Sequence, residues 1–298
     1  MMLPEYPTLG GSDAGTRPGT TVPSALKRFG NRMRGPARYM DRINTENFPG
    51  GPEMVLGGSR MVTGMIAPPP LRTSTSFSPA RLRSVDLVGP AGRLEAVLNE
   101  GAPQAPFAAL ICHPHPKGGG SLHNKVVYHA MKVLNDPAWG FGLPVLRFNF
   151  RGTGLSQGRH DGRLEAGDVR AAIDWLENEY HLPMVVAGFS FGAAMALRAC
   201  CALAQSDPAL KALIALGLPT AAEGRTYTYR FLADCTTAKL FLSGDQDQYA
   251  PATELAQVVD SVPAPKKLLL IGGADHFFTG QLNQMQQALG CWLKEQLS

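Results

Sequence analysis

From Leu82 onward, short apolar runs alternate with stretches of helical periodicity, and this alternation limits the fold more than any other feature of the chain. Eight runs predict strands, at residues 83–88, 94–98, 108–112, 145–150, 184–187, 212–216, 239–242 and 268–271. Five stretches predict helices, near residues 124–134, 165–180, 191–203, 253–262 and 282–297. The first two strands flank Gly89-Pro90-Ala91-Gly92 and predict a hairpin. We therefore expect an α/β fold in which a mostly parallel eight-stranded sheet carries helices on both faces.

The predicted helix at residues 165–180 has apolar residues on one side and acids on the other. This pattern is typical of a helix that packs on a sheet and exposes its polar side. We expect its acids to lie in solvent, with the first two near the positive end of the helix dipole; they are Glu165, Asp168 and Asp174.

Residues 1–80 differ from the rest of the chain in composition and charge. They are rich in Gly, Pro, Ser and Thr, and they hold nine Lys and Arg against five Asp and Glu. This imbalance accounts for the whole net charge of +4. We predict a disordered or loosely ordered basic leader at residues 1–80 and one α/β domain at residues 81–298. Alternatives for the leader are a transit peptide, an anchoring arm, or a reading frame that begins at Met54, Met61 or Met65.

The rest of the composition limits the partners of the chain. Residues 81–298 have balanced charge, which argues against a nucleic-acid partner. No apolar run approaches the roughly 18 residues of a membrane span, which argues against a membrane partner. The five cysteines show no C-x-x-C spacing, so we expect reduced thiols rather than disulfides or a zinc site. These features predict a cytoplasmic protein, and organelle targeting by the leader is the alternative. The oligomeric state is left open between a monomer and a dimer.

The motif Gly188-Phe189-Ser190-Phe191-Gly192 lies between a predicted strand and a predicted helix. A G-x-S-x-G at this position forms a nucleophile elbow, a sharp turn that exposes the serine at the sheet edge. Glycines flank the serine because a Cβ atom would collide in so tight a turn. The motif predicts that Ser190 is a reactive nucleophile.

Two later loops supply the partners that a nucleophilic serine needs. Asp247 follows the predicted strand at 239–242, and we prefer it as the acid to Asp245, which we expect to close the turn. His276 follows the strand at 268–271, and its neighbour Asp275 is expected to be a turn residue. The chain order Ser190, Asp247, His276 and the strand-end placement of all three predict a catalytic triad at the carboxyl edge of the sheet.

Ester chemistry also needs an oxyanion hole, which is a pair of N–H donors for the charged tetrahedral intermediate. The N–H of Phe191, directly after the serine, is the first expected donor. The second should come from the loop after the third strand, where Pro114 and Pro116 have no N–H to give. We choose His115 for this role, and the alternatives are Lys117 and Gly118.

The same region is rich in histidine, which raises the alternative of a metal site built from His113, His115, His123 and His129. Alternate residues of an extended segment point to opposite sides, and the flanking loop supplies no carboxylate or cysteine. Neither common phosphate-loop pattern is present. We therefore expect no metal and no cofactor.

Residues 82–298 resemble the α/β-hydrolase superfamily, and within it a group of small, mostly bacterial predicted hydrolases. The resemblance rests on five motifs: His-Pro-His-Pro at 113–116 with Gly119-Gly120, the run at 147–156, the elbow at 188–192, Gly244-x-x-Asp247 and Asp275-His276-Phe277. It implies a metal-free serine hydrolase with Ser190 as nucleophile, His276 as base and Asp247 as the acid that orients it. Arg151-Gly152 matches a turn that shapes the sheet edge. The dienelactone-hydrolase branch has cysteine at the nucleophile position, and Ser190 departs from it.

Only residues 217–237 separate the sixth predicted strand from the seventh, where lipases insert a helical lid. We therefore expect an open site for a small soluble acyl substrate. The expected reaction is hydrolysis of carboxylic esters or thioesters through an acyl-enzyme. A peptidase or amidase with the same triad is the first alternative, and a non-catalytic interaction module is the second.

Overall fold

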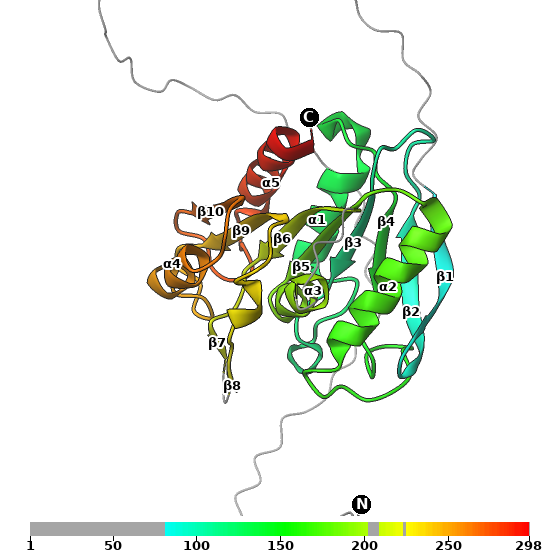
Figure 1. Cartoon of the computed structure of the whole chain (residues 1–298), viewed down its shortest axis with the longest axis horizontal. Helices are drawn as coiled ribbons and strands as arrows, with labels where there is room; N and C mark the ends of the chain where they lie inside the picture. Colours follow the sequence, from blue (N-terminus) through cyan, green and yellow to red (C-terminus); the bar gives the residue numbers. More distant parts are fainter. Residues whose placement is uncertain (1–80, 202–208, 223–224, 298) are drawn as a thin grey trace, which may run out of the picture. The chain divides into compact units, whose positions relative to one another are not determined.

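The computed structural model describes residues 81–201, 209–222 and 225–297. The leader predicted at residues 1–80 lies outside these residues. Eight strands form one sheet in the order β1-β2-β4-β3-β5-β6-β9-β10 (Figure 1). Their bounds are β1 Leu82–Gly89, β2 Gly92–Asn99, β3 Ala108–Cys112, β4 Val145–Phe148, β5 Met184–Phe189, β6 Leu210–Leu216, β9 Ala238–Gly244 and β10 Lys266–Ile271.

The sheet begins antiparallel and continues parallel, as the sequence predicts. β1 pairs antiparallel with β2 through a tight hairpin that brings Gly89 opposite Gly92. Gly92 has a φ of 111°, a conformation that residues with a Cβ atom rarely adopt. β2 is also antiparallel to β4, and every pair from β4 through β3, β5, β6 and β9 to β10 is parallel. The carboxyl ends of the parallel strands therefore meet at one edge, where open α/β sheets bind ligands.

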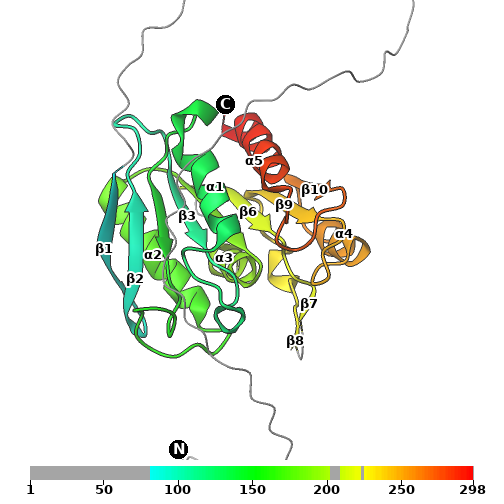
Figure 2. The same cartoon turned by 180° about the vertical axis from the view of Figure 1, so that it is seen from behind.

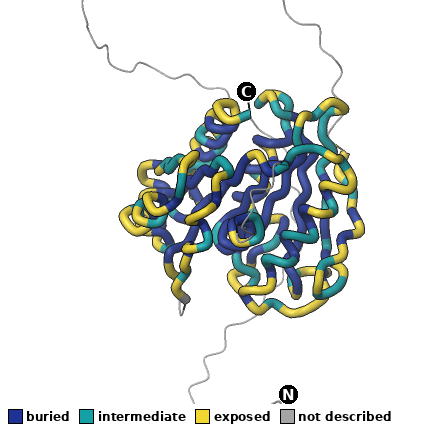
Figure 3. The backbone as a smooth tube through the Cα atoms, in the orientation of Figure 1, coloured by how far each residue is buried: buried dark blue, intermediate teal, exposed yellow. Residues whose placement is uncertain are grey.

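Helices cover both faces of the sheet, as Figures 1 and 2 show. One face packs against α1 (Lys125–Asn135) and α5 (Leu282–Leu297). The other packs against α2 (Glu165–Tyr180), α3 (Phe191–Cys201) and α4 (Ala252–Asp260). Because both faces are covered, every residue of β3, β4 and β5 is buried, and these strands form the dark centre of Figure 3. The fold is thus the α/β-hydrolase fold that the sequence predicts.

The segment between β6 and β9 contains only small elements in its described residues. They are the strands β7 (Ala221–Ala222) and β8 (Arg225–Thr226), which pair as a hairpin, and the 3₁₀ helix η3 (Arg230–Leu232). The described part of this segment holds no α-helix that would cover the sheet edge. The short hairpin was not predicted, because two-residue strands leave no periodicity in the sequence.

The prediction that the first acids of α2 lie in solvent is wrong. Glu165 and Asp168 are both fully buried. Asp168 accepts hydrogen bonds from the backbone N–H of Arg151 at 3.1 Å and from its guanidinium Nη2 at 2.7 Å. Glu165 accepts from the N–H of Asp161 at 2.9 Å. Both acids are buried because the loop that follows β4 folds over the start of α2, whereas Asp174, beyond the reach of that loop, is exposed as predicted.

The expectation of reduced thiols is wrong for one pair of cysteines. Cys201, at the end of α3, forms a disulfide with Cys235, and their Cα atoms are 5.3 Å apart. The bond links the helix that follows Ser190 to the segment just before β9. Cys112, Cys200 and Cys291 remain thiols. Separately, no helix in the described part of the chain is long and apolar enough to cross a membrane.

Candidate active site

Ser190 lies at the turn between β5 and α3 in a strained conformation. Its φ is 54°, in the left-handed region that residues other than glycine rarely adopt. The Ser190 N–H donates to the carbonyl of Leu216 at 2.8 Å, and its own carbonyl accepts from Ala194 at 3.1 Å. These bonds hold the turn from both sides. Backbone strain of this kind costs about 1–3 kcal/mol and concentrates at functional sites.

The two glycines of the elbow are required by close approach of backbone atoms. A Cβ atom on Gly188 would lie 2.4 Å from the carbonyl oxygen of Gly192. A Cβ atom on Gly192 would lie 2.4 Å from the carbonyl oxygens of both Cys112 and His113. Distances this short do not occur between a real Cβ and an oxygen, so both positions must be glycine. The second contact also shows that α3 begins directly against the loop that follows β3.

Asp247 and His276 form a buried pair at the carboxyl ends of β9 and β10. Nδ1 of His276 is 2.8 Å from Oδ2 of Asp247. The same carboxylate accepts a hydrogen bond from the hydroxyl of Ser243 at 2.9 Å and one from the N–H of Tyr249 at 2.9 Å. Because a carboxylate only accepts, Nδ1 carries the proton and Nε2 is the basic nitrogen. Ser243 was not predicted from the sequence, although its place four residues before the acid puts it within reach.

His276 lies beside the elbow that presents Ser190. Its ring centroid is 4.9 Å from that of Phe189, the residue before the serine. Gly217 follows Leu216, whose carbonyl accepts from the Ser190 N–H, and it lies close to both rings. A Cβ added to Gly217 would be 3.0 Å from the Phe189 side chain and 3.2 Å from that of His276. The structure therefore brings the predicted serine, acid and histidine to one point of the sheet edge.

Of the two neighbouring acids, Asp275 has the turn role that the sequence predicts, while Asp245 bonds an N–H of another loop instead of closing its own turn. Asp245 is exposed, and its Oδ1 accepts from the N–H of Gly273 at 2.6 Å, which joins the loops after β9 and β10. Asp275 accepts from the N–H groups of Thr279 at 2.9 Å and Phe277 at 3.0 Å. These hydrogen bonds, that of Thr279 first, hold the pKa of the Asp275 carboxyl below its usual value.

The loop after β3 contains a single turn of 3₁₀ helix, η1 (Pro116–Gly118), next to the start of α3. The His115 ring lies 5.0 Å from the Phe191 ring, centroid to centroid. The N–H of Lys117 donates to His115 Nδ1 at 3.2 Å, and the N–H of Gly118 donates to the His115 carbonyl at 3.0 Å. The N–H groups of Lys117 and Gly118, the two alternative oxyanion donors, therefore already donate hydrogen bonds within the loop. Phe191 opens α3, and N–H groups in the first turn of a helix have no partner within the helix.

His113 has a structural role that the sequence analysis did not foresee. It is fully buried, its Nε2 accepts from the N–H of Phe150 at 3.0 Å, and its Nδ1 lies 2.6 Å from the carbonyl of Pro114. Nδ1 must therefore carry the proton. Burial lowers the pKa of His113 to about 4, so the ring is neutral near pH 7. The neutral ring links the loop after β3 to the end of β4. In the described residues, no group of three or more His, Cys, Asp or Glu is arranged to hold a metal ion.

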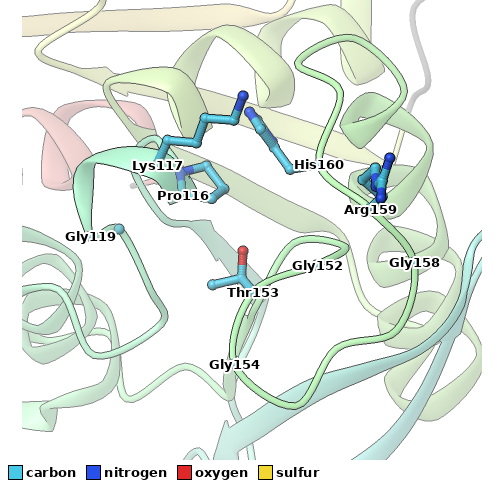
Figure 4. A pocket seen from close by; sticks show the side chains of 10 residues that line it. Pro116, Lys117, Gly119, Gly152, Thr153, Gly154, Gly158, Arg159 and His160 are labelled. Atoms are coloured by element: carbon cyan, nitrogen blue, oxygen red, sulfur yellow. The ribbon is translucent and has the colours of Figure 1, made fainter. Parts of the chain in front are cut away.

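A pocket of about 690 Å³ opens beside this loop (Figure 4). One wall is formed by the 3₁₀ turn and the glycines after it, and the other by the loop that follows β4. The side chains of Lys117 and His160 extend toward each other across the pocket, and the hydroxyl of Thr153 points into it. Thr153, Arg159 and His160 were not predicted as site residues, because nothing local in the sequence shows that these two loops face each other.

Comparison with known proteins places the chain in a family. Residues 117–290 match the family model of the alpha/beta hydrolase domain. An uncharacterised protein of Rickettsia prowazekii is 36% identical over 214 residues, which cover 69% of this chain and 86% of that protein. An alpha-beta serine hydrolase homologue from Coxiella burnetii is 32% identical with a TM-score of 0.63, and the match covers 73% of this chain and all of that structure.

A serine hydrolase without a lid from Xanthomonas campestris is 30% identical, also with a TM-score of 0.63. This match covers 74% of this chain and 97% of that structure. The family model covers more than half of the chain, and both structures are matched over nearly their whole length. The chain belongs to the alpha/beta hydrolase domain family and is a hydrolase by fold.

Proposed function

We propose that this protein is a serine hydrolase that cleaves carboxylic esters, thioesters included, of small soluble substrates. Ser190 is the nucleophile, His276 the general base and Asp247 the acid that orients the base. The observation that carries the proposal is the buried pair of Asp247 and His276, 2.8 Å apart, placed against the strained turn of Ser190. Structural relatives described as serine hydrolases support it.

The reaction follows from the chemistry of these three groups. Nε2 of His276 takes the proton of Ser190 as Oγ attacks the ester carbonyl carbon, which gives a tetrahedral intermediate with a negative oxygen. When the intermediate collapses, the imidazolium returns that proton to the departing alcohol or thiol. Water then attacks the acyl-enzyme by the same route, which releases the acid and restores the serine. The Asp247 carboxylate keeps Nδ1 protonated and stabilises the imidazolium.

The oxyanion would be held by the backbone N–H groups of Phe191 and His115. Two features support this choice: the residues are in ring contact, and Phe191 begins α3, where the helix dipole favours negative charge. Loss of one such donor lowers turnover by about 10² to 10³-fold in other enzymes of this chemistry.

An amidase or peptidase with the same triad is the competing function. An amide nitrogen leaves only when it is protonated, which places a stricter demand on the position of His276 than an alcohol does. The described residues between β6 and β9 form no helical cover, so the site is built from short loops. This openness favours small esters over a peptide held in an extended cleft.

The test uses p-nitrophenyl butyrate and butyryl p-nitroanilide, which share one acyl group and differ in the bond cleaved. We expect measurable kcat with the ester, little with the anilide, and a loss of at least about 10³-fold in Ser190→Ala. Ser261→Ala serves as control, because it removes an exposed hydroxyl that donates to the carbonyl of Val258. Equal rates in native protein and Ser190→Ala would contradict the proposal. Preference for the anilide would favour the amidase.

A further inference from the structure

We infer that the substrate carries an anionic group, a carboxylate or a phosphate, which binds Lys117 and Arg159 in the pocket between the loops after β3 and β4. This inference rests on the proposed function and adds the chemical class of the substrate. The pocket adjoins the proposed oxyanion donor His115, because Pro116, the next residue, is part of its lining.

Three rings in edge-to-face contact lie between the pocket and the elbow. His160 lines the pocket, and its ring centroid is 4.6 Å from that of His115 and 5.5 Å from that of Phe191. Phe191 directly follows Ser190, and its ring is part of the core. The route from the oxyanion hole to the pocket therefore runs past His115, the proposed second donor, whose neighbour Pro116 lines the pocket.

The lining of the pocket is cationic. It contains the side chains of Lys117 and Arg159, both exposed, and no carboxylate. Neither cation has an ion-pair partner in the part of the chain that the structure describes. Two unpaired cations facing one cavity attract an anionic ligand and would repel a cationic one.

Three acids of the loop after β4 and the start of α2 lie outside the pocket lining. Glu165 is buried, with Oε1 2.7 Å from Nδ1 of His160. Asp168 is bound to the guanidinium of Arg151. Asp161 accepts hydrogen bonds from the N–H groups of Arg163 at 2.7 Å and Leu164 at 2.9 Å. The charged side chains that line the pocket itself are therefore Lys117 and Arg159, with His160 beside them.

Thr153 adds a hydrogen-bonding group to the pocket. Its Oγ1 points into the pocket in Figure 4 and has no hydrogen-bond partner within the described residues.

The two walls are held in place by one polar network, so the pocket exists before a ligand binds. Asn149 accepts from the N–H of Leu122 at 2.7 Å and donates to Glu95 at 2.7 Å. Oε2 of Glu95 also accepts from the N–H of Leu155 at 2.8 Å. The side chain of Asn149, at the start of the loop after β4, thus holds Leu122 in the loop after β3. A preformed site loses less free energy to ordering when it binds its ligand.

The test compares four p-nitrophenyl esters of equal chain length that end in methyl, carboxylate, phosphonate or ammonium groups. In native protein we expect kcat/KM for one of the anionic esters to exceed that for the methyl ester by about tenfold, with the ammonium ester the poorest. Lys117→Gln and Arg159→Gln should each raise KM for that anionic ester about threefold to tenfold and leave the methyl ester within twofold. Lys132→Gln, an exposed lysine of α1 outside the pocket lining, should change neither.

The outcomes separate this inference from the proposed function. Turnover of the methyl ester with no preference for either anionic ester, or equal loss on all esters in the two variants, would overturn the anionic subsite alone. Absence of turnover with every ester would overturn the proposed function. In that case calorimetric titration with adipate and with inorganic phosphate decides the inference: binding that is lost in the Lys117→Gln/Arg159→Gln double variant supports it, and no binding overturns it.

Discussion

The imidazole of His276 and the carboxylate of Asp247 lie 2.8 Å apart, although they follow different strands of the sheet. The pair is buried, while the neighbouring acid Asp245 is exposed and bonds a backbone N–H. The difference between these two acids gives a matched pair of variants.

Asp247→Asn should lower kcat for p-nitrophenyl esters by about 10³ to 10⁴-fold. The amide would place a donor opposite Nδ1 and favour the wrong tautomer of His276. Asp245→Asn keeps the acceptor for Gly273 and should stay within about threefold of native activity. Steady-state kinetics on both purified variants make the comparison. A large loss in Asp245→Asn with little change in Asp247→Asn would show that Asp245 is the acid.

Gly192→Ala should both destabilise the protein and reduce activity, because the new Cβ would meet the carbonyl oxygens of Cys112 and His113 at 2.4 Å. Pushing α3 away from β3 would cost about 1–3 kcal/mol in the free energy of unfolding, measured in urea. Gly272→Ala is the control, since its Cβ would come no closer than 3.9 Å to its nearest neighbour. Equal stability of the two variants would contradict the close packing at the elbow.

Asp168→Asn should lower the free energy of unfolding by about 3–5 kcal/mol, because it leaves the buried guanidinium of Arg151 without its counter-ion. Asp174→Asn removes an exposed acid on the same helix that pairs with Arg170, and should cost less than about 0.5 kcal/mol. Urea unfolding monitored by circular dichroism measures both. Similar losses in the two variants would mean that the burial of Asp168 has no energetic consequence.

His113 should make the fold less stable as the pH falls. Its pKa is about 4 in the folded protein and near 6.5 when unfolded, so between these values the unfolded chain binds the extra proton. The free energy of unfolding should therefore fall by roughly 3 kcal/mol from above pH 6.5 to pH 4 because of this group. In His113→Asn this slope should flatten, whereas in the exposed His123→Asn it should persist. An unchanged slope in His113→Asn would contradict the assignment.

The architecture could be predicted from the sequence because each strand and helix is marked by the pattern of apolar residues within its own segment. All eight predicted strands lie in the sheet, and the helices at 165–180 and 282–297 have the predicted bounds. The elbow was also predictable, because a sharp turn between a strand and a helix requires glycines at fixed spacing. Asp275 likewise has the turn role expected from its neighbours.

What could not be predicted depends on contacts between distant segments. Glu165 and Asp168 have the pattern of an exposed helix side, and only the loop after β4 makes them buried. The disulfide between Cys201 and Cys235 spans 34 residues and has no spacing rule. From the sequence, His113 was part of the His-Pro-His-Pro motif and of a metal site that was argued against, and its link to Phe150 appears once β3 and β4 are neighbours.

Labelling with a fluorophosphonate probe is the sharpest test of Ser190 as the nucleophile, because the probe reacts only with an activated serine. We expect native protein to be labelled at Ser190, as located by peptide mass spectrometry, and Ser190→Ala to stay unlabelled. His276→Gln should be labelled at least about 10²-fold more slowly, since the general base is lost. Absence of labelling in native protein, or equal labelling of Ser190→Ala, would contradict the account.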